Sequence, residues 1–371
     1  MSSRRRFLRA LGLGALGVPA AGALSAQSVP EALLPPGLQP LPRTGAPGVT
    51  PGAAPAPRLP LVKPPRLRPG GLIGLVAPAG HLDREGQVED TQRELEALGF
   101  RSRPGRHALA RHGYLAGTDQ QRAEDLMAMF LDDDVDAILA LRGGWGCARL
   151  LPLLDYDAIR AHPKPLVGYS DITALLLAIY ARSGLVTFHG PVGRSTWSAQ
   201  TVESFKQVLV RGGELYLSPV PPGGFGGRRD GYQPIRPGIA DGPLVGGNLS
   251  VVSSLAGTPY LPSFAGHVVF FEEVREDIYR IDRMITQLRL AGLFDEAAAI
   301  VFGQCRSCSA DEVPGDGLAW LLRDHFGDGA HPAWTGAPIG HVSPVHTLPI
   351  GVPFFTDAAL GTLVMQEPAV A

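Results

Sequence analysis

The sequence predicts an α/β protein, with an N-terminal, mostly parallel sheet flanked by helices and a second, smaller domain that is α/β or β-rich. Three observations lead to this prediction. Short apolar runs alternate with stretches of helical spacing, as in 72–98 and 119–141. The runs are apolar at every position, which is typical of strands buried on both faces of a parallel sheet. A length of 371 residues favours two domains, and the glycine-rich stretch 223–231 separates the two halves.

Composition narrows the classes of function. The 33 basic and 35 acidic residues give a net charge of -2, so we expect no basic surface for nucleic acid. The three cysteines, Cys147, Cys305 and Cys308, are too few for a disulfide framework. Cys305 and Cys308 form one C-x-x-C, but a zinc site needs a second pair or two suitably spaced histidines. Two small loop residues or one local disulfide are favoured over a metal or redox centre.

Residues 1–26 have the pattern of an export signal, with a basic start, an apolar stretch and small residues near Ala26. Within it, SRRRFLR resembles the twin-arginine signal, which directs folded proteins through the twin-arginine export machinery. An ordinary secretory leader or a basic amphipathic helix is the alternative. We therefore expect a periplasmic protein. Retention by an uncleaved leader is less favoured, because the apolar stretch contains glycines and Pro19 and is short for a stable span.

The remainder is divided by composition. Residues 27–68 are rich in Pro, Ala and Gly without helical or strand periodicity, and we expect a disordered linker there. An N-terminal domain is predicted at 69–221, a crossover linker at 222–233 and a C-terminal domain at 234–371. No other apolar run reaches membrane-spanning length.

The order of elements follows from periodicity. In the N-terminal domain, strands are expected at 72–77, 137–141, 165–168 and 185–188, and helices at 87–98, 119–129 and 172–181. Thr118 is the expected N-cap of the second helix. In the C-terminal domain we expect a strand at 267–271, a helix at 279–290 and a strand at 299–302.

Ser170 is a candidate nucleophile, because GYSDIT places it between a strand and a helix. At such a turn a hydroxyl projects from the sheet edge, and helix amides stabilise developing negative charge. From this segment alone, helix capping by Ser170 or Asp171 is the favoured interpretation, and other features must decide. The preceding strand ends in RGGWG, on the same sheet edge, where the amide of Gly144 could join that of Asp171 as an oxyanion hole. A plain tight turn is the alternative, and the spacing fits neither common phosphate-binding pattern.

A serine nucleophile needs a base and an orienting carboxylate. His189 follows a strand of the same sheet, and His341 lies in GHVS near the C-terminus; the residues alone do not choose between them. Glu272 and Glu273 end a strand, and only one of two adjacent strand residues can face a site. Cys147 as a thiol nucleophile is less favoured than Cys147 as a small buried residue.

From Leu72 to Leu363 the chain resembles the LD-carboxypeptidases, bacterial serine peptidases that include muramoyltetrapeptide carboxypeptidase. The resemblance rests on the joint order of seven motifs: LIGLVAPAG, RGGWGCARLLPLLDY, GYSDITAL, TFHGPV, GGNLS, FFEEVREDIYRIDRM and GHVSPVHTLPIG. It implies a nucleophile in the N-terminal domain, a carboxylate and a base in the C-terminal domain, and an active site in the cleft between them.

By this resemblance the catalytic residues are Ser170, Glu272 and His341, and the backbone amides of Gly144 and Asp171 form the oxyanion hole. His189 becomes a supporting residue of the pocket wall, and Asn248 an organiser of the domain junction. Arg142 is a weak candidate for the subsite of the substrate carboxylate, since a structural salt bridge would explain it as well. Trp145 and Cys147 depart from the usual tyrosine and small residue, which affects only the pocket wall.

The implied reaction is hydrolysis of the LD-peptide bond to a terminal D-alanine in peptidoglycan stem peptides, without metal or organic cofactor. The expected partners are the peptide substrate and the export machinery, and a homodimer is compatible with the sequence. Two alternatives stay open: a microcin-immunity-type peptidase acting on peptide-nucleotide conjugates, and a non-catalytic periplasmic protein that binds muropeptides. Family members that recycle murein work in the cytoplasm, whereas this chain carries an export signal, so the resemblance defines the chemistry more firmly than the substrate.

Overall fold

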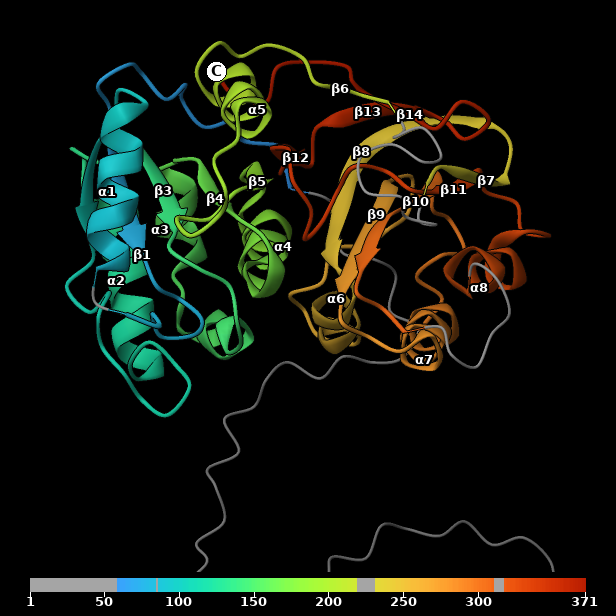
Figure 1. Ribbon diagram of the computed structural model, residues 1–371, viewed down its shortest axis with the longest axis horizontal. Coiled ribbons are helices and arrows are strands. Elements are labelled where there is room, and N and C mark those ends of the chain that lie inside the picture. The colour runs from blue at the N-terminus through green and yellow to red at the C-terminus, as the bar shows by residue number, and fades with distance from the viewer. Residues whose placement is uncertain (1–58, 85, 219–230, 310–316) are drawn as a thin grey trace, which may run out of the picture. The chain divides into compact units, whose positions relative to one another are not determined.

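The computed structural model describes residues 59–84, 86–218, 231–309 and 317–371 (Figure 1). The predicted export signal, residues 27–58 of the predicted linker and residues 222–230 of the predicted crossover lie outside this part. None of the helices in the described ranges is both long and apolar enough to cross a membrane.

Six strands form the first sheet, in the order β12-β5-β4-β3-β1-β2. Its parallel strands are β1 (Leu72–Val76), β2 (Arg101–Pro104), β3 (Ala137–Ala140), β4 (Leu166–Gly168) and β5 (Thr187–His189). The helical segments between or after them are α1 (Gln87–Ala97), α2 (Asp119–Leu131), the 3₁₀ helix Cys147–Leu153, α3 (Tyr156–Ala161), α4 (Thr173–Ser183) and α5 (Ala199–Leu209). Thr118 caps α2 as predicted, since its side chain accepts from the Gln121 amide. The mostly parallel, helix-flanked sheet is confirmed.

Eight strands form the second sheet, in the order β6-β14-β13-β8-β9-β10-β11-β7. Its parallel centre consists of β8 (Ile239–Asn248), β9 (Val268–Val274), β10 (Ala299–Arg306) and β11 (Ala333–Thr335). The antiparallel flanks are β6 (Tyr216–Leu217), β7 (Gln233–Arg236), β13 (Pro353–Asp357) and β14 (Thr362–Met365). Three helices accompany these strands: α6 (Leu249–Leu255), α7 (Ile278–Leu290) and α8 (Gly317–Phe326).

Two strands cross the predicted domain boundaries. Strand β12 (Leu348–Ile350) comes from the C-terminal segment but pairs antiparallel with β5 in the first sheet, as Figure 1 shows. Strand β6 lies before residue 221 but pairs with β14 in the second sheet. The two sheets therefore exchange strands, and neither corresponds to one uninterrupted chain segment.

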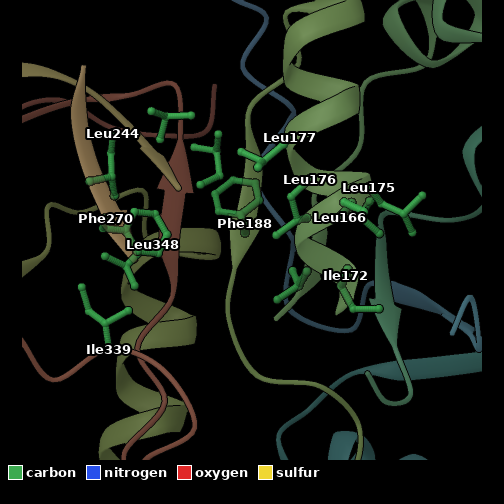
Figure 2. Packing of buried hydrophobic residues seen from close by; sticks show 14 of the residues in the cluster. Leu166, Ile172, Leu175, Leu176, Leu177, Phe188, Leu244, Phe270, Ile339 and Leu348 are labelled. Carbon is green, nitrogen blue, oxygen red and sulfur yellow. The ribbon is translucent and has the colours of Figure 1, made fainter. Parts of the chain in front are cut away.

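Apolar side chains fill the space between the two sheets. Phe188 of β5 lies between Leu348 and Phe270 on one side and Leu176 of α4 on the other (Figure 2). All four side chains are 0 % exposed and belong to one continuous core. Burial of this kind contributes about 25 cal/mol per Å² of apolar surface, so separating the sheets here would be costly.

Residues 59–68 were expected to be part of a disordered linker, and this prediction is wrong for them. Val62 pairs with the chain around Leu185, accepting from the Val186 amide at 2.9 Å. The Leu67 amide donates to the Leu209 carbonyl at 2.9 Å, and the Leu67 side chain is fully buried. Proline favours an extended chain, and backbone hydrogen bonds together with the buried Leu67 side chain attach it to the rest of the domain.

Candidate active site

Ser170 lies on a strained turn between β4 and α4. Its φ is 65°, in the left-handed region that residues other than glycine seldom occupy. A single 3₁₀ turn, Ser170–Ile172, leads directly into α4. Backbone strain of this kind persists where the surrounding structure enforces it, and it is concentrated at functional sites. The turn fits the strand-to-helix geometry that exposes a nucleophilic hydroxyl.

The RGGWG loop after β3 contacts this turn directly. A β-carbon on Gly143 would lie 2.8 Å from Ser170 Cβ and 3.0 Å from its Oγ, so only glycine fits there. Gly144 has a φ of 131° and packs against the Gly80 backbone. Within the described residues, neither the Gly144 nor the Asp171 amide donates a hydrogen bond to another backbone group. Both candidate oxyanion donors thus remain available for a ligand.

Asp171 ties the loop to the turn. Its carboxylate accepts a hydrogen bond of 2.8 Å from the Cys147 amide. Burial raises the pKa of Asp171 despite this bond. Cys147 itself is fully buried, and burial raises the pKa of its thiol well above the usual range. A thiolate at Cys147 is therefore disfavoured, in agreement with its interpretation as a small buried residue.

The other loop residues have different surroundings. Arg142 donates to the His81 carbonyl at 2.6 Å and to an Asp83 carboxylate oxygen at 2.8 Å. These bonds are the structural salt bridge that was the alternative to a carboxylate subsite. Trp145 is 63 % exposed and makes an edge-to-face contact with Tyr114, with ring centroids 6.2 Å apart.

Glu272 and His341 form a hydrogen-bonded pair. Glu272 lies in β9 with 0 % exposure, and its Oε2 is 2.7 Å from His341 Nδ1. Gly340, at a φ of 114°, packs so closely that a β-carbon would lie 2.7 Å from Glu272 Cβ. Burial alone would raise the pKa of Glu272, but the hydrogen bond and charge of His341 lower it below its usual range. Burial by itself would lower the pKa of His341. The hydrogen bond and charge of Glu272 outweigh this effect, so the pKa of His341 is raised above its usual value.

Tyr169 brings the two halves of the site together. Its ring, one residue before Ser170, lies 4.8 Å from the His341 ring, centroid to centroid, in an edge-to-face contact. The His341 side chain from the second sheet therefore adjoins the serine turn of the first. No hydrogen bond links Ser170 Oγ to His341 among the residues described; such bonds often tighten only when substrate binds. Sequence reasoning missed Tyr169, although its place in GYSD was a usable signal.

Within the described ranges, His189 makes no hydrogen bond through its ring, although Glu272 and His341 lie near enough for their charges to affect its pKa. Its ring is 6.0 Å from Tyr169 and 5.2 Å from Phe270, and both ring nitrogens are buried without a hydrogen-bond partner. Burial lowers the pKa of His189 to about 4. A histidine that is neutral and faces apolar rings suits a wall of the site and not a proton acceptor.

Asn248 lies where the two sheets meet. The backbone N–H of Asn248 donates a hydrogen bond of 3.1 Å to Thr173 Oγ1, in the first turn of α4. Its side chain caps α6 and donates to Glu273 Oε1 at 2.9 Å. Gly247 lies so close to Thr173 that a β-carbon would be 2.6 Å from it. These contacts brace the helix that follows Ser170.

Across the described ranges, no three or more His, Cys, Asp or Glu side chains are grouped so as to hold a metal ion. Cys305 and Cys308 form a disulfide, which is one of the two arrangements favoured from the sequence.

Comparison with known proteins identifies the family. Residues 73–190 match the LD-carboxypeptidase N-terminal domain, and residues 241–354 match the LD-carboxypeptidase C-terminal domain. A probable murein peptide carboxypeptidase of Bacillus subtilis is 36% identical over 310 residues, 82% of this chain and 94% of that protein. The chain belongs to the LD-carboxypeptidase family.

Two further comparisons extend this assignment. The murein tetrapeptide carboxypeptidase of Pseudomonas aeruginosa is 35% identical to this LD-carboxypeptidase family member over 295 residues, 76% of this chain and 91% of that protein. The solved structure of MccF in complex with glutamyl sulfamoyl guanosine superposes with a TM-score of 0.75 at 26% identity, covering 83% of this chain and 99% of that one. The predicted family and two-part α/β fold are confirmed.

Proposed function

We propose that this family member is a serine-type LD-carboxypeptidase that removes the terminal D-alanine from peptidoglycan stem peptides, converting murein tetrapeptide to tripeptide. The contact of Tyr169 with His341 carries the proposal, because it places the Glu272–His341 pair beside the residue that precedes Ser170. The names of the Bacillus and Pseudomonas relatives support the class of substrate.

Acylation is the first half of the proposed reaction. Glu272 engages His341 Nδ1, which leaves Nε2 to take the proton of Ser170 Oγ. The oxygen then attacks the carbonyl carbon between an L-configured centre and the terminal D-alanine. The amides of Gly144 and Asp171 stabilise the resulting oxyanion, and one donor of this kind contributes roughly 3 kcal/mol in other enzymes. As the C–N bond breaks, His341 returns the proton to the amine and D-alanine leaves.

Deacylation repeats the sequence with water. His341 Nε2 removes a proton from water, whose oxygen attacks the ester carbon of the acyl-enzyme. The ester C–O bond then breaks, and the proton passes from His341 to Ser170 Oγ, which restores the free enzyme and releases a tripeptide carboxylate. The scheme contains no metal or organic cofactor.

Release of D-alanine from defined muropeptides tests the proposal. The full-length protein is incubated with disaccharide tetrapeptide, pentapeptide and tripeptide, and products are followed by mass spectrometry. We expect tetrapeptide to lose D-alanine and Ser170→Ala to lower the rate by several orders of magnitude. Ser254→Ala, which alters an exposed hydroxyl on α6, is the matched control. Equal rates for Ser170→Ala and wild type would refute a serine mechanism.

The likeness to MccF supports a second candidate, a microcin-immunity-type peptidase acting on peptide-nucleotide conjugates. Cleavage of glutamyl sulfamoyl guanosine together with intact murein tetrapeptide would favour this activity. A wild-type protein that binds tetrapeptide but cleaves neither compound would instead be a non-catalytic muropeptide-binding protein.

We also propose that the protein works in the periplasm after twin-arginine export. The Cys305–Cys308 disulfide supports this location, because disulfides persist in the periplasm and are rare in the cytoplasm. Replacing Arg4 and Arg5 by lysine should leave the protein in the cytoplasmic fraction, whereas wild type should appear in the periplasmic fraction. Identical fractionation of both would refute this route.

A further inference from the structure

Arg306 is an exposed cation next to the candidate base. It is the last residue of β10, and its Nη1 donates to the His341 backbone carbonyl at 3.2 Å. The guanidinium lies near enough to lower the pKa of both His341 and Tyr169 by its charge, although other groups decide the net shifts. Among the described residues, only the His341 carbonyl engages one of the five N–H groups of Arg306, which leaves donors for a ligand.

The backbone around Arg306 is firmly positioned. The Cys305–Cys308 disulfide closes a short ring around Arg306 and Ser307, and Ser307 has a φ of 60°. The Arg306 carbonyl accepts from the Arg275 amide at 2.9 Å, and Ser309 pairs with Asp277 just beyond the ring. The guanidinium is thus carried by a loop with little freedom, which lowers the entropy lost on binding a ligand.

Two other arginines near the serine turn share a carboxylate partner. Arg142 and Arg194 both bind the carboxylate of Asp83, at 2.8 and 3.2 Å. Arg306 forms no ion pair with any acidic side chain in the described ranges. Of Arg142, Arg194 and Arg306, therefore, only Arg306 has no carboxylate partner among the described residues.

The proposed reaction requires a partner for the substrate carboxylate, and a cation can provide it. A carboxypeptidase must recognise the free carboxylate of the residue that it releases, and burying that carboxylate without a partner would be costly. In an amino acid the carboxylate is separated from the amine by a single carbon. Because His341 protonates that amine, the carboxylate must lie within a few ångströms of the imidazole, and Arg306 is a cation bonded to the same residue. A guanidinium can bind it in bidentate geometry.

We propose that Arg306 binds the terminal α-carboxylate of the leaving D-amino acid and so restricts the enzyme to the chain end. This inference rests on the proposed carboxypeptidase function. It replaces Arg142, the earlier candidate for this subsite, whose guanidinium is occupied by Asp83 and the His81 carbonyl.

Paired substrates test the assignment. Murein tetrapeptide with a free terminal carboxylate is compared with the same peptide ending in a carboxamide. Wild type should prefer the acid, and Arg306→Gln should lower kcat/KM for the acid by about 10- to 100-fold, mainly through KM, as expected for loss of a charge-assisted hydrogen bond. The rate on the amide should change less than threefold, so that the preference disappears. Arg306→Lys should restore part of it, since lysine keeps the charge but not the planar fork.

Arg275→Gln is the matched control, because it removes the same charge from the strand end that pairs with Arg306. It should keep the wild-type preference for the acid. If Arg306→Gln slows both substrates equally, or if Arg275→Gln abolishes the preference as well, a specific carboxylate contact is refuted. Circular dichroism and melting temperature confirm that each variant is folded.

Binding measurements separate this inference from the proposed function. In a Ser170→Ala background, calorimetry should show that Arg306→Gln weakens binding of the acid about tenfold or more and leaves binding of the amide unchanged. If wild type cleaves neither peptide, the proposed function is refuted. The carboxylate subsite is then still tested by the affinities for the acid and the amide. Unchanged affinity for the acid would overturn the subsite.

Discussion

Glu272 and Glu273 are adjacent carboxylates in β9 that bind different partners on opposite sides of the strand. Glu272 accepts from His341 Nδ1 at 2.7 Å. Glu273 accepts from the Ser250 amide and hydroxyl at 2.8 and 2.7 Å, and from Asn248 Nδ2 at 2.9 Å. Side chains alternate across a strand, so the first carboxylate meets the imidazole while the second fastens the start of α6. Neutralising each in turn should therefore have separable effects.

Glu272→Gln should impair catalysis and shift its pH dependence. Gln lacks the negative charge that fixes the His341 tautomer and stabilises its protonated form, and the analogous change in a serine protease triad lowers kcat by on the order of 10⁴. Wild-type kcat/KM should rise with pH through the pKa of His341, because the base must be neutral to accept a proton. Burial lowers that pKa and Glu272 raises it to a greater extent, so loss of Glu272 should move the acid limb to lower pH. A pH–rate profile that keeps its wild-type limb would contradict this role.

Glu273→Gln should impair stability and spare the chemistry. The Ser250 amide would face an NH₂ or lose its acceptor, and an unsatisfied buried group costs about 1–3 kcal/mol. We expect the free energy of unfolding in urea to fall by that amount, while kcat stays within a few-fold of wild type. The comparison with Glu272→Gln is the control, since both remove one carboxylate from the same strand. A loss of kcat as large as that of Glu272→Gln would show that the two residues do not act separately.

Most of the central strands and helices of the fold could be predicted from periodicity. Strands such as β1 and β3 are apolar at every position, and their runs were recognisable within one or two residues of the observed bounds. Strand β2 was missed because its four residues, RSRP, are polar and only partly buried at the sheet edge. Strand β12 was missed because its pairing with β5 joins residues about 160 positions apart, which no local pattern encodes.

The candidate site was predictable only in part. Local spacing drew attention to Ser170, but the residues alone left His189 and His341 equivalent, and only the family resemblance favoured His341. The difference is physical: His341 meets a carboxylate, whereas both nitrogens of His189 lack a partner in the described structure. The roles of Arg142 and Arg306 could not be predicted for the same reason. Arg142 binds Asp83 and Arg306 binds the His341 carbonyl, and both contacts join residues far apart in the sequence.

Gly143→Ala should lower kcat by about 100-fold or more. Its φ is not in the left-handed region, so alanine costs no backbone strain, but the new methyl would lie 2.8 Å from Ser170 Cβ. The serine turn or the loop must move, and a displacement of about 1 Å can cost 10²-fold in rate.

Gly70→Ala is the converse control, since Gly70 has a φ of 75° and open space around it. It should lower the free energy of unfolding by about 1 kcal/mol at unchanged kcat. Full activity of Gly143→Ala would show that this contact does not position Ser170.

His189→Met should make the protein less sensitive to acid. In the folded protein burial lowers the pKa of His189 to about 4, whereas an unfolded histidine titrates near 6.5. Between these values the unfolded chain binds a proton that the folded protein does not, so stability is lost as the pH falls from about 6.5 to about 4. The shift corresponds to roughly 3 kcal/mol at most. Urea unfolding at pH 7, 5.5 and 4 should show a smaller acid-induced loss for His189→Met than for wild type. The control is His112→Gln, which replaces an exposed histidine and should follow wild type. If all three proteins show the same pH dependence, His189 is protonated as readily in the folded protein as in the unfolded chain, and the prediction is wrong.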